Sequence, residues 1–291
     1  MRVGIIGIGN MGMGMTKRVL AQGHTVHVRD IRPEAEAEAR GLGAIVERNP
    51  GALARQVNHV VVIVLNAAQI EDVLFGSHGV ADAARPGLAV VLSSTIAPND
   101  TTDFAERLAR LGVGCIDAPV SGGPARAVEG TISMMVAGHK RAVAQAEPLL
   151  NTLASRVFRI SDQAGDAAKA KLINNLLAGI NLVAGASALA LSKRIGLDAK
   201  LMYELICASS GQSWVFADRM ARALSDDYQP RAHAHILTKD LGLALEMAGA
   251  AAFDTPLGDY ALQVFHATCA AGWSDDDDAA VFKTLMGERA L

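Results

Sequence analysis

A glycine-rich segment near the start of the chain has the spacing that seats phosphates on a helix. It follows the apolar run 2–6 and reads Gly7, Ile8, Gly9, Asn10, Met11, Gly12. In such a segment the first glycine permits a tight turn, the second lets the backbone approach a pyrophosphate, and the third allows close packing of helix on strand. Strand, glycine turn and helix in succession predict that residues 7–12 bind a nicotinamide or flavin dinucleotide.

An acidic residue ends the next apolar run, 25–29, at about the 20-residue spacing expected for a ribose-binding carboxylate. Asp30 would accept a hydrogen bond from the ribose 2′-hydroxyl and would repel the 2′-phosphate of NADP. We therefore expect NAD as the cofactor. Arg29 and Arg32 flank Asp30 and could bind that phosphate if they turned inward, so NADP remains possible.

Two lysines in the proline-free stretch 166–195 are candidates for proton transfer. Alcohol oxidation by hydride transfer needs a group that takes the hydroxyl proton, and a lysine does so when burial or a cationic neighbour lowers its pKa. Lys171 shares a helix face with Asn175, four residues further on. A solvated helix lysine is the plainer interpretation, and spacing alone does not choose between Lys171 and Lys169.

A serine followed by two glycines lies within the segment Asp117 to Pro124. Ser121 offers a hydroxyl, and Gly122 and Gly123 leave backbone N–H groups exposed, which together make a small nest suited to a carboxylate. The same residues also suit an ordinary turn after a strand. Spacing alone favours neither interpretation.

Short apolar runs must position these groups. Valine, isoleucine and leucine dominate such runs at 2–7, 25–29, 59–65, 88–93, 131–137 and 157–160. Unbroken apolar runs are typical of strands buried on both faces of a parallel sheet, and helical stretches between them make strand–helix–strand units. The first part of the chain is therefore predicted to be a doubly wound α/β domain of the Rossmann type.

After residue 165 helical patterns dominate to the end of the chain. We expect a dinucleotide-binding domain over 1–162 and an all-α domain for substrate binding and oligomerisation over 163–291, with 166–195 as a long spine helix. Substrate should then meet the cofactor in a cleft between the two.

Composition restricts the function classes. The net charge is −3, and no Lys/Arg cluster marks a nucleic-acid surface. No apolar stretch is expected to span a bilayer, and the glycine motif argues against a signal peptide at the amino end. Cys115, Cys207 and Cys269 are widely spaced, so we expect free thiols in a protein of the cytoplasm.

No metal site is expected. His233 and His235 are two residues apart, and the sequence shows no third ligand near them. The acidic run 275–278 lacks the glycine and the terminal glutamate of a calcium-binding loop.

The glycine, Ser-Gly-Gly and Lys171–Asn175 segments, in this order, resemble the β-hydroxyacid dehydrogenase family over essentially the whole chain. The resemblance implies that Ser121, Gly122 and Gly123 bind substrate. It also implies that Lys171 is the catalytic lysine, in preference to Lys169, and that Asn175 binds substrate.

Cofactor-side positions follow from the same resemblance. The pairs Leu65–Asn66 and Ser94–Thr95 match loops beside the cofactor, and Lys239, in the segment Lys239-Asp240-Leu241, is expected near the nicotinamide. Leu92 stands where many members carry aspartate, and residues 232–235 replace a region with phenylalanine, so the family alone does not identify the substrate.

The segments 210–216 and 273–278 look most similar to the L-threonate dehydrogenase branch, which implies a four-carbon sugar acid or a 3-hydroxyisobutyrate-like acid as substrate. Reduction of tartronate semialdehyde or glyoxylate with NAD(P)H, and a non-catalytic NAD-binding role, are the alternatives. A homodimer or homotetramer is expected, because the helical part carries more apolar surface than it would readily bury.

Overall fold

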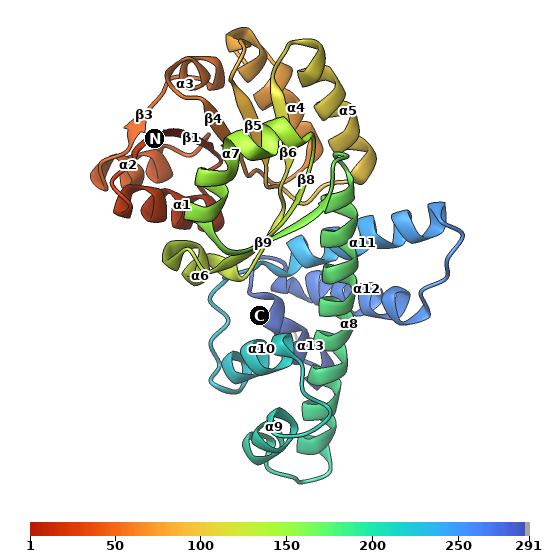
Figure 1. Ribbon diagram of the computed structural model, residues 1–291. Coiled ribbons are helices and arrows are strands. Elements are labelled where there is room, and N and C mark those ends of the chain that lie inside the picture. Colours follow the sequence, from red (N-terminus) through yellow and green to blue (C-terminus); the bar gives the residue numbers. More distant parts are fainter. Residues whose placement is uncertain (289–291) are drawn as a thin grey trace. The chain divides into compact units, whose positions relative to one another are not determined.

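The computed structural model describes residues 1–288, so the last three residues of the predicted second domain lie outside the described residues. The chain divides into two compact units, Met1–Lys171 and the part from Leu172 onward. Figure 1 shows the strands in the first of these and only helices in the second.

A nine-stranded sheet forms the centre of the first unit. The strands are β1 (Arg2–Ile6), β2 (Thr25–Arg29), β3 (Ile45–Val46), β4 (His59–Val62), β5 (Ala89–Leu92), β6 (Gly114–Asp117), β7 (Val120–Ser121), β8 (Ile132–Ala137) and β9 (Ala154–Ser161). Their order in the sheet is β3-β2-β1-β4-β5-β6-β8-β7, with β9 paired to β8. The neighbouring strands β3, β2, β1, β4, β5 and β6 run parallel to one another, whereas β8 runs antiparallel to β6 and β7.

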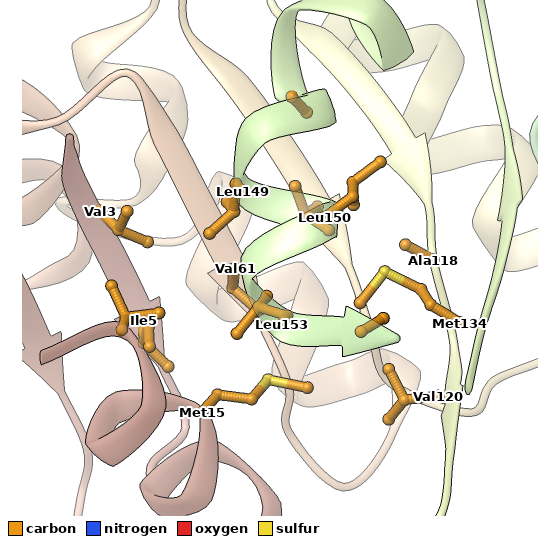
Figure 2. Packing of buried hydrophobic residues seen from close by; sticks show 14 of the residues in the cluster. Val3, Ile5, Met15, Val61, Ala118, Val120, Met134, Leu149, Leu150 and Leu153 are labelled. Carbon is orange, nitrogen blue, oxygen red and sulfur yellow. The ribbon is translucent and has the colours of Figure 1, made fainter. Parts of the chain in front are cut away.

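Helices cover both faces of this sheet. They are α1 (Asn10–Ala21), α2 (Pro33–Gly41), α3 (Pro50–Gln56), α4 (Ala67–Phe75), the short η1 (Val80–Ala83), α5 (Pro98–Arg110), α6 (Gly123–Glu129) and α7 (Lys140–Leu153). Successive residues of β4 alternate between two cores, because side chains of a strand point to opposite faces. Val61 packs with α1 and α7 (Figure 2), whereas Val60 and Val62 pack with α3, α4 and α5. The predicted doubly wound α/β fold is confirmed.

The second unit is helical and has its own core. Its elements are α8 (Asp166–Arg194, which begins in the first unit), α9 (Ala199–Cys207), α10 (Trp214–Leu224), α11 (Ala234–Ala250), α12 (Pro256–Thr268), η2 (Cys269–Trp273), η3 (Asp278–Ala280) and α13 (Val281–Met286). Two glycines of α8 allow close packing: a Cβ on Gly185 would stand 2.4 Å from Phe216, and one on Gly179 would stand 2.8 Å from Leu241.

Helix α8 is the one described helix that is long and apolar enough to cross a membrane by length and composition, although we expected no such stretch from the sequence. This evidence is weak, because the core helix of a folded domain has the same properties. Leu182, Val183 and Leu189 of α8 lie buried in the core of the second unit. Part of α8 therefore packs in the core of the second unit, whereas Ile173, Leu177 and Leu191 of the same helix are exposed.

The structure corrects several predicted strand bounds. The predicted strand 59–65 ends at Val62, and Ile63 begins the loop that follows. Strands β3, β6 and β7 were not predicted; they are two to four residues long, and β6 includes both a glycine and an aspartate. The division between units falls within α8, so the predicted boundary at residues 162 and 163 stays a prediction.

Candidate active site

Parallel strands gather most of the predicted cofactor-side residues at one edge of the sheet. Strands β2, β1, β4, β5 and β6 are neighbours and run in the same direction. The segments that follow them therefore share the carboxyl edge, which is where open α/β sheets bind ligands. These segments carry Gly7 to Gly12, Asp30, Leu65, Asn66, Thr95 and Ser121.

The three glycines of the first loop have distinct surroundings. Gly7 has a φ of +86°, and a Cβ there would lie 2.3 Å from the carbonyl oxygen of Ile63. A Cβ on Gly12 would lie 2.0 Å from the carbonyl oxygen of Gly7, so α1 approaches the loop too closely for any side chain. Gly9 is the N-cap of α1, and its Cβ would meet only the end of Arg32, at 3.8 Å. The backbone at Gly9 is therefore open to a phosphate, with Asn10 and Met11 in the first helical turn beside it.

The carboxylate of Asp30 is buried and ties β2 to the glycine loop. Its Oδ2 accepts a hydrogen bond from the Ile8 N–H at 2.7 Å, and its Oδ1 accepts from the backbone N–H of Arg32 at 2.9 Å and from the guanidinium at 3.2 Å. The Arg29 guanidinium donates a hydrogen bond to Glu36 Oε1 at 2.6 Å. Arg32 thus lies beside both the Asp30 carboxylate and the open side of Gly9. The carboxylate that would favour NAD and the guanidinium that could bind the 2′-phosphate of NADP therefore lie next to each other.

The loop after β4 is fixed by hydrogen bonds from two elements. Asn66 is the N-cap of α4 and accepts from the Gln69 N–H at 2.9 Å, while Gln69 Oε1 accepts from the Leu65 N–H at 2.8 Å. Ser94 Oγ accepts from the Val64 N–H at 2.8 Å. Capping accounts for Asn66 structurally, and contacts of Leu65, Asn66 and Thr95 with a cofactor stay predictions.

The Ser121–Gly123 loop has the backbone form of a nest. Gly122 and Gly123 have φ values of +138° and +80°, and α6 begins at Gly123. A Cβ on Gly123 would meet nothing within 4 Å, so its backbone is open. Ser121 is held in place by antiparallel pairing with Ser133 of β8. These features support the predicted carboxylate-binding role without testing it.

A buried carboxylate that we did not single out from the sequence holds the start of α8. Asp117 ends β6, and its Oδ2 accepts hydrogen bonds from the N–H groups of Gly165 at 2.8 Å and of Ala167 and Ala168 at 3.0 Å. Burial raises the pKa of Asp117 to about 6, against the effect of these three hydrogen bonds. Asp117 thereby fixes the first turn of the helix that carries Lys171.

The two candidate lysines differ sharply in burial. Lys169 has a side chain that is 56% exposed, and its Nζ donates to Asp166 at 2.8 Å, as in an ordinary pair at a helix start. Lys171 is 8% exposed. Of the two lysines, the buried one is the better placed to meet a substrate out of bulk water, so burial favours Lys171 for proton transfer.

In the second unit a buried aspartate joins two predicted site residues. Asp240 is 4% exposed; its Oδ2 accepts from Asn175 Nδ2 and its Oδ1 accepts from Lys239 Nζ, both at 2.7 Å. Asn174 Nδ2 donates to Asn175 Oδ1 at 3.1 Å, so the amide is oriented at both ends. The sequence analysis assigned no role to Asp240, although its place directly after Lys239 was a signal.

The structure overturns the reason given against a metal site. His233, His235 and Asp275 each offer one candidate ligand atom, and these atoms lie within 4.8 Å of one another. A third ligand was not visible from the sequence, because Asp275 reaches the histidines only through pairing of segments about 40 residues apart.

The two parts of the chain match two families of cofactor-binding domains. Residues 2–161 match the NAD binding domain of 6-phosphogluconate dehydrogenase, and residues 165–285 match the NAD-binding domain of NADP-dependent 3-hydroxyisobutyrate dehydrogenase.

Whole-chain relatives carry dehydrogenase names. An L-threonate dehydrogenase of Cupriavidus necator is 39% identical over 285 residues, covering 98% of this chain and 96% of that protein. The mitochondrial 3-hydroxyisobutyrate dehydrogenase of Rattus norvegicus is 31% identical over 296 residues, covering 99% of this chain and 88% of that protein.

Solved structures agree with these relatives. The crystal structure of 3-hydroxyisobutyrate dehydrogenase from Salmonella typhimurium has a TM-score of 0.91 at 39% identity and covers 97% of this chain and 99% of that chain. The structure of Psf3 in complex with NADP+ and 2-OPP has a TM-score of 0.90 at 27% identity, with the same two shares.

Proposed function

Because this chain belongs to the β-hydroxyacid dehydrogenase family and has NAD(P)-binding domains, we propose that it oxidises the alcohol carbon of a four-carbon sugar acid of the L-threonate type. The observation that carries this proposal is the burial of Lys171 and Asn175, four residues apart on one face of α8. A lysine and an amide in that arrangement can serve one substrate alcohol.

In the proposed reaction the Lys171 amine takes the hydroxyl proton as the carbon gives up its hydride. Asn175 donates one Nδ2–H to Asp240 and has a second N–H for a substrate oxygen. The nicotinamide, when bound, accepts the hydride. Asp240 also holds Lys239, which would help to position the nicotinamide and the substrate.

The substrate carboxylate is assigned to the loop of Ser121, Gly122 and Gly123. The serine hydroxyl and the backbone N–H groups at two residues with positive φ are donors that suit an anion. Recognition of the carboxylate in this way fixes the distance to the reacting carbon and therefore the alignment of the hydride path.

We propose NAD rather than NADP as the preferred cofactor. Asp30 presents a buried carboxylate at the end of β2, where a ribose hydroxyl would be recognised. Arg32 is the feature that supports the alternative, since its side chain is 49% exposed and stands beside Asp30.

Relatives named L-threonate dehydrogenase are 37% to 39% identical to this chain, compared with 31% for the mitochondrial relatives named 3-hydroxyisobutyrate dehydrogenase, whereas the Salmonella typhimurium structure of that second name is also 39% identical. The comparison with the mitochondrial relatives favours a four-carbon sugar acid over a 3-hydroxyisobutyrate-like acid. Reduction of tartronate semialdehyde or glyoxylate, and NAD binding without catalysis, are outcomes that the assay must separate.

The test follows reduced nicotinamide by absorbance while purified protein is offered L-threonate, D-threonate, both erythronates, glycerate and 3-hydroxyisobutyrate, and in reverse tartronate semialdehyde and glyoxylate. Lys171→Ala should lower kcat by about 10²- to 10⁴-fold, while Lys169→Ala, its matched control, should keep full turnover. Equal turnover in wild type and Lys171→Ala would remove Lys171 from the proton-transfer role, and cofactor binding without turnover on any acid would favour a binding protein.

We also propose that the chain forms a homodimer or homotetramer. A location in the cytoplasm is a separate proposal, which rests on the three free cysteines. Several apolar side chains of the second unit are exposed, which is typical of an interface: Ile173, Leu177, Leu191, Leu201, Leu205, Leu257 and Tyr260. Light scattering should give a mass two or four times the 30.4 kDa of one chain, and a monomer at all concentrations would contradict this.

A further inference from the structure

We propose that His233, His235 and Asp275 form a binding site for one divalent transition-metal ion, with Zn²⁺ as the ion best suited to their nitrogen and oxygen ligands. All three residues belong to the second unit, and none has a role in the proposed hydride transfer.

Main-chain pairing builds the frame of this site. His233 forms an antiparallel bridge with Asp277. On one side of the bridge the Ala234 N–H donates to the Asp276 carbonyl at 2.9 Å and the His235 N–H donates to the Ser274 carbonyl at 3.2 Å. The segment before α11 is therefore fastened to the segment after η2, and the three side chains are brought together by backbone structure.

Each of the two imidazoles has its Nδ1 against a backbone carbonyl oxygen. His233 Nδ1 lies 2.7 Å from the Asp275 carbonyl oxygen, and His235 Nδ1 lies 2.9 Å from the Ser274 carbonyl oxygen. A carbonyl oxygen can only accept, so each Nδ1 is the donor in these contacts and Nε2 is the nitrogen that they leave for a metal ion. Histidine ligands of metals commonly use one nitrogen for a backbone carbonyl in this way. The rings are also stacked, with centroids 5.1 Å apart.

Charge pairing sets Asp275 apart from the rest of its acidic run. Asp276 pairs with Lys283, Asp277 with Arg222, and Asp278 with Arg219. In the described part of the chain the ion-pair partner of Asp275 is His235, with Oδ1 3.5 Å from Nδ1. The carboxylate is thus available to a cation beside the two imidazoles, and its side chain is 92% exposed and able to move.

Modest movement would complete the coordination. Ligand atoms of a tetrahedral zinc ion are about 3.3 Å apart, given bonds of about 2.0–2.1 Å. One nitrogen of each ring and one oxygen of Asp275 already lie within 4.8 Å of one another, and Oδ1 of Asp275 now lies 3.5 Å from His235 Nδ1, so coordination through Nε2 requires the exposed Asp275 side chain to rotate toward that side of the rings. Water would take the fourth position. The bound ion would fix the first turn of α11, one turn before Lys239 and Asp240.

The test is calorimetric titration of Zn²⁺ into tag-free protein freed of metal with a chelator. We expect one ion per chain with a dissociation constant of about 10 μM or tighter, and a thermal unfolding temperature raised by about 5 °C at a hundredfold excess over that constant. His233→Ala and His235→Ala should each weaken binding at least about tenfold, as expected for loss of a ligand.

His266→Ala is the matched control, because His266 is an exposed histidine of the same unit, on α12. A Cys207→Ser, Cys269→Ser double variant tests the thiols, and both controls should bind Zn²⁺ as the wild type does. Circular dichroism will show whether the histidine variants are folded. Absence of stoichiometric binding at 100-μM Zn²⁺ (about tenfold above the expected constant), or equal affinity in wild type and folded histidine variants, would overturn the proposal.

Discussion

Asp240 links the chemistry of two other residues, and its effect should be visible in kinetics. It accepts hydrogen bonds from Asn175 and Lys239 at 2.7 Å, and it is buried. Asp240→Asn removes the negative charge that pairs with Lys239. It also replaces one of the two acceptor oxygens of Asp240 by an NH₂ group, which cannot accept a hydrogen bond from Asn175 or Lys239. Because small misplacements of a positioning group are costly, we expect kcat to fall by about 10- to 100-fold.

Steady-state kinetics on the best substrate would measure this effect, with thermal unfolding measured alongside. A merely structural role would lower the unfolding temperature and leave kcat of the folded fraction unchanged, and that result would contradict the assignment of Asp240 as a positioning residue.

Gly9 and Gly12 should respond differently to the same substitution. Gly12→Ala places a Cβ 2.0 Å from a backbone oxygen that cannot move freely, so we expect a loss of stability of about 1–3 kcal/mol even without cofactor. Gly9→Ala meets only the flexible end of Arg32 and should fold normally, but its methyl group occupies the side from which a pyrophosphate would approach.

Thermal unfolding without cofactor and fluorescence titration of NADH would compare these two variants. We expect weakened NADH binding in both and lowered stability in Gly12→Ala alone. Unchanged NADH affinity in Gly9→Ala would show that the pyrophosphate does not approach this loop.

Helix α8 depends at its start on one carboxylate of a neighbouring strand. Asp117→Ala would leave three buried N–H groups of the segment 165–168 without their acceptor, whereas Asp117→Asn retains an acceptor oxygen. We expect Asp117→Ala to be less stable than Asp117→Asn by about 1–3 kcal/mol, measured by chemical unfolding. Equal stability would mean that the hydrogen bonds to Asp117 do not hold α8 in place.

The same carboxylate gives a pH dependence with a definite sign. The pKa of Asp117 is raised from its ordinary 3.8 to about 6, so the folded chain binds this proton more tightly than the unfolded chain. The contribution to stability is therefore fully present below about pH 4 and is lost as the pH rises through about 6. Relative to Asp117→Asn, which does not titrate, the wild type should lose about 3 kcal/mol between pH 4 and 7. Unfolding curves across this range would show a constant difference if burial does not raise the pKa.

Local pattern was informative where a strand is uniformly apolar, and less so where its composition is mixed, as in β6, which has the same length as β4 and β5. The apolar content of β1, β2, β4 and β5 predicted a buried parallel sheet, and the structure confirms it. The same rule extended β4 too far, because Ile63 to Leu65 continue the apolar run into a loop. Strand β6 escaped prediction because its pairing with β5, rather than its composition, makes it a strand.

Long-range pairing explains what the sequence could not show about the site. Asp117 meets residues 48 to 51 positions away, and Asp240 meets Asn175 across 65 positions. No local spacing encodes such contacts. By contrast, the glycine loop was recognisable because its spacing lies within six consecutive residues, whereas Lys171 was chosen over Lys169 from the family resemblance and not from spacing.

For the whole molecule, cofactor binding should be readable as a gain in thermal stability, and its size should distinguish NAD from NADP. Any ligand that binds only the folded chain stabilises it, by about 2.7 kcal/mol at a concentration one hundred times its dissociation constant. With Asp30 buried at the end of β2, we expect NAD to raise the unfolding temperature more than NADP at equal concentration.

Asp30→Ala and Arg32→Ala identify which side chain makes the choice. Loss of the carboxylate should reduce the NAD shift and leave Arg32 to receive a phosphate, so the NADP shift should rise; loss of the guanidinium should affect NADP alone. Asp30 also accepts the Ile8 N–H, and Asp30→Asn therefore serves as a variant that keeps an acceptor for the loop. A larger shift with NADP in the wild type, abolished in Arg32→Ala, would show instead that Arg32 sets the preference because it binds the 2′-phosphate.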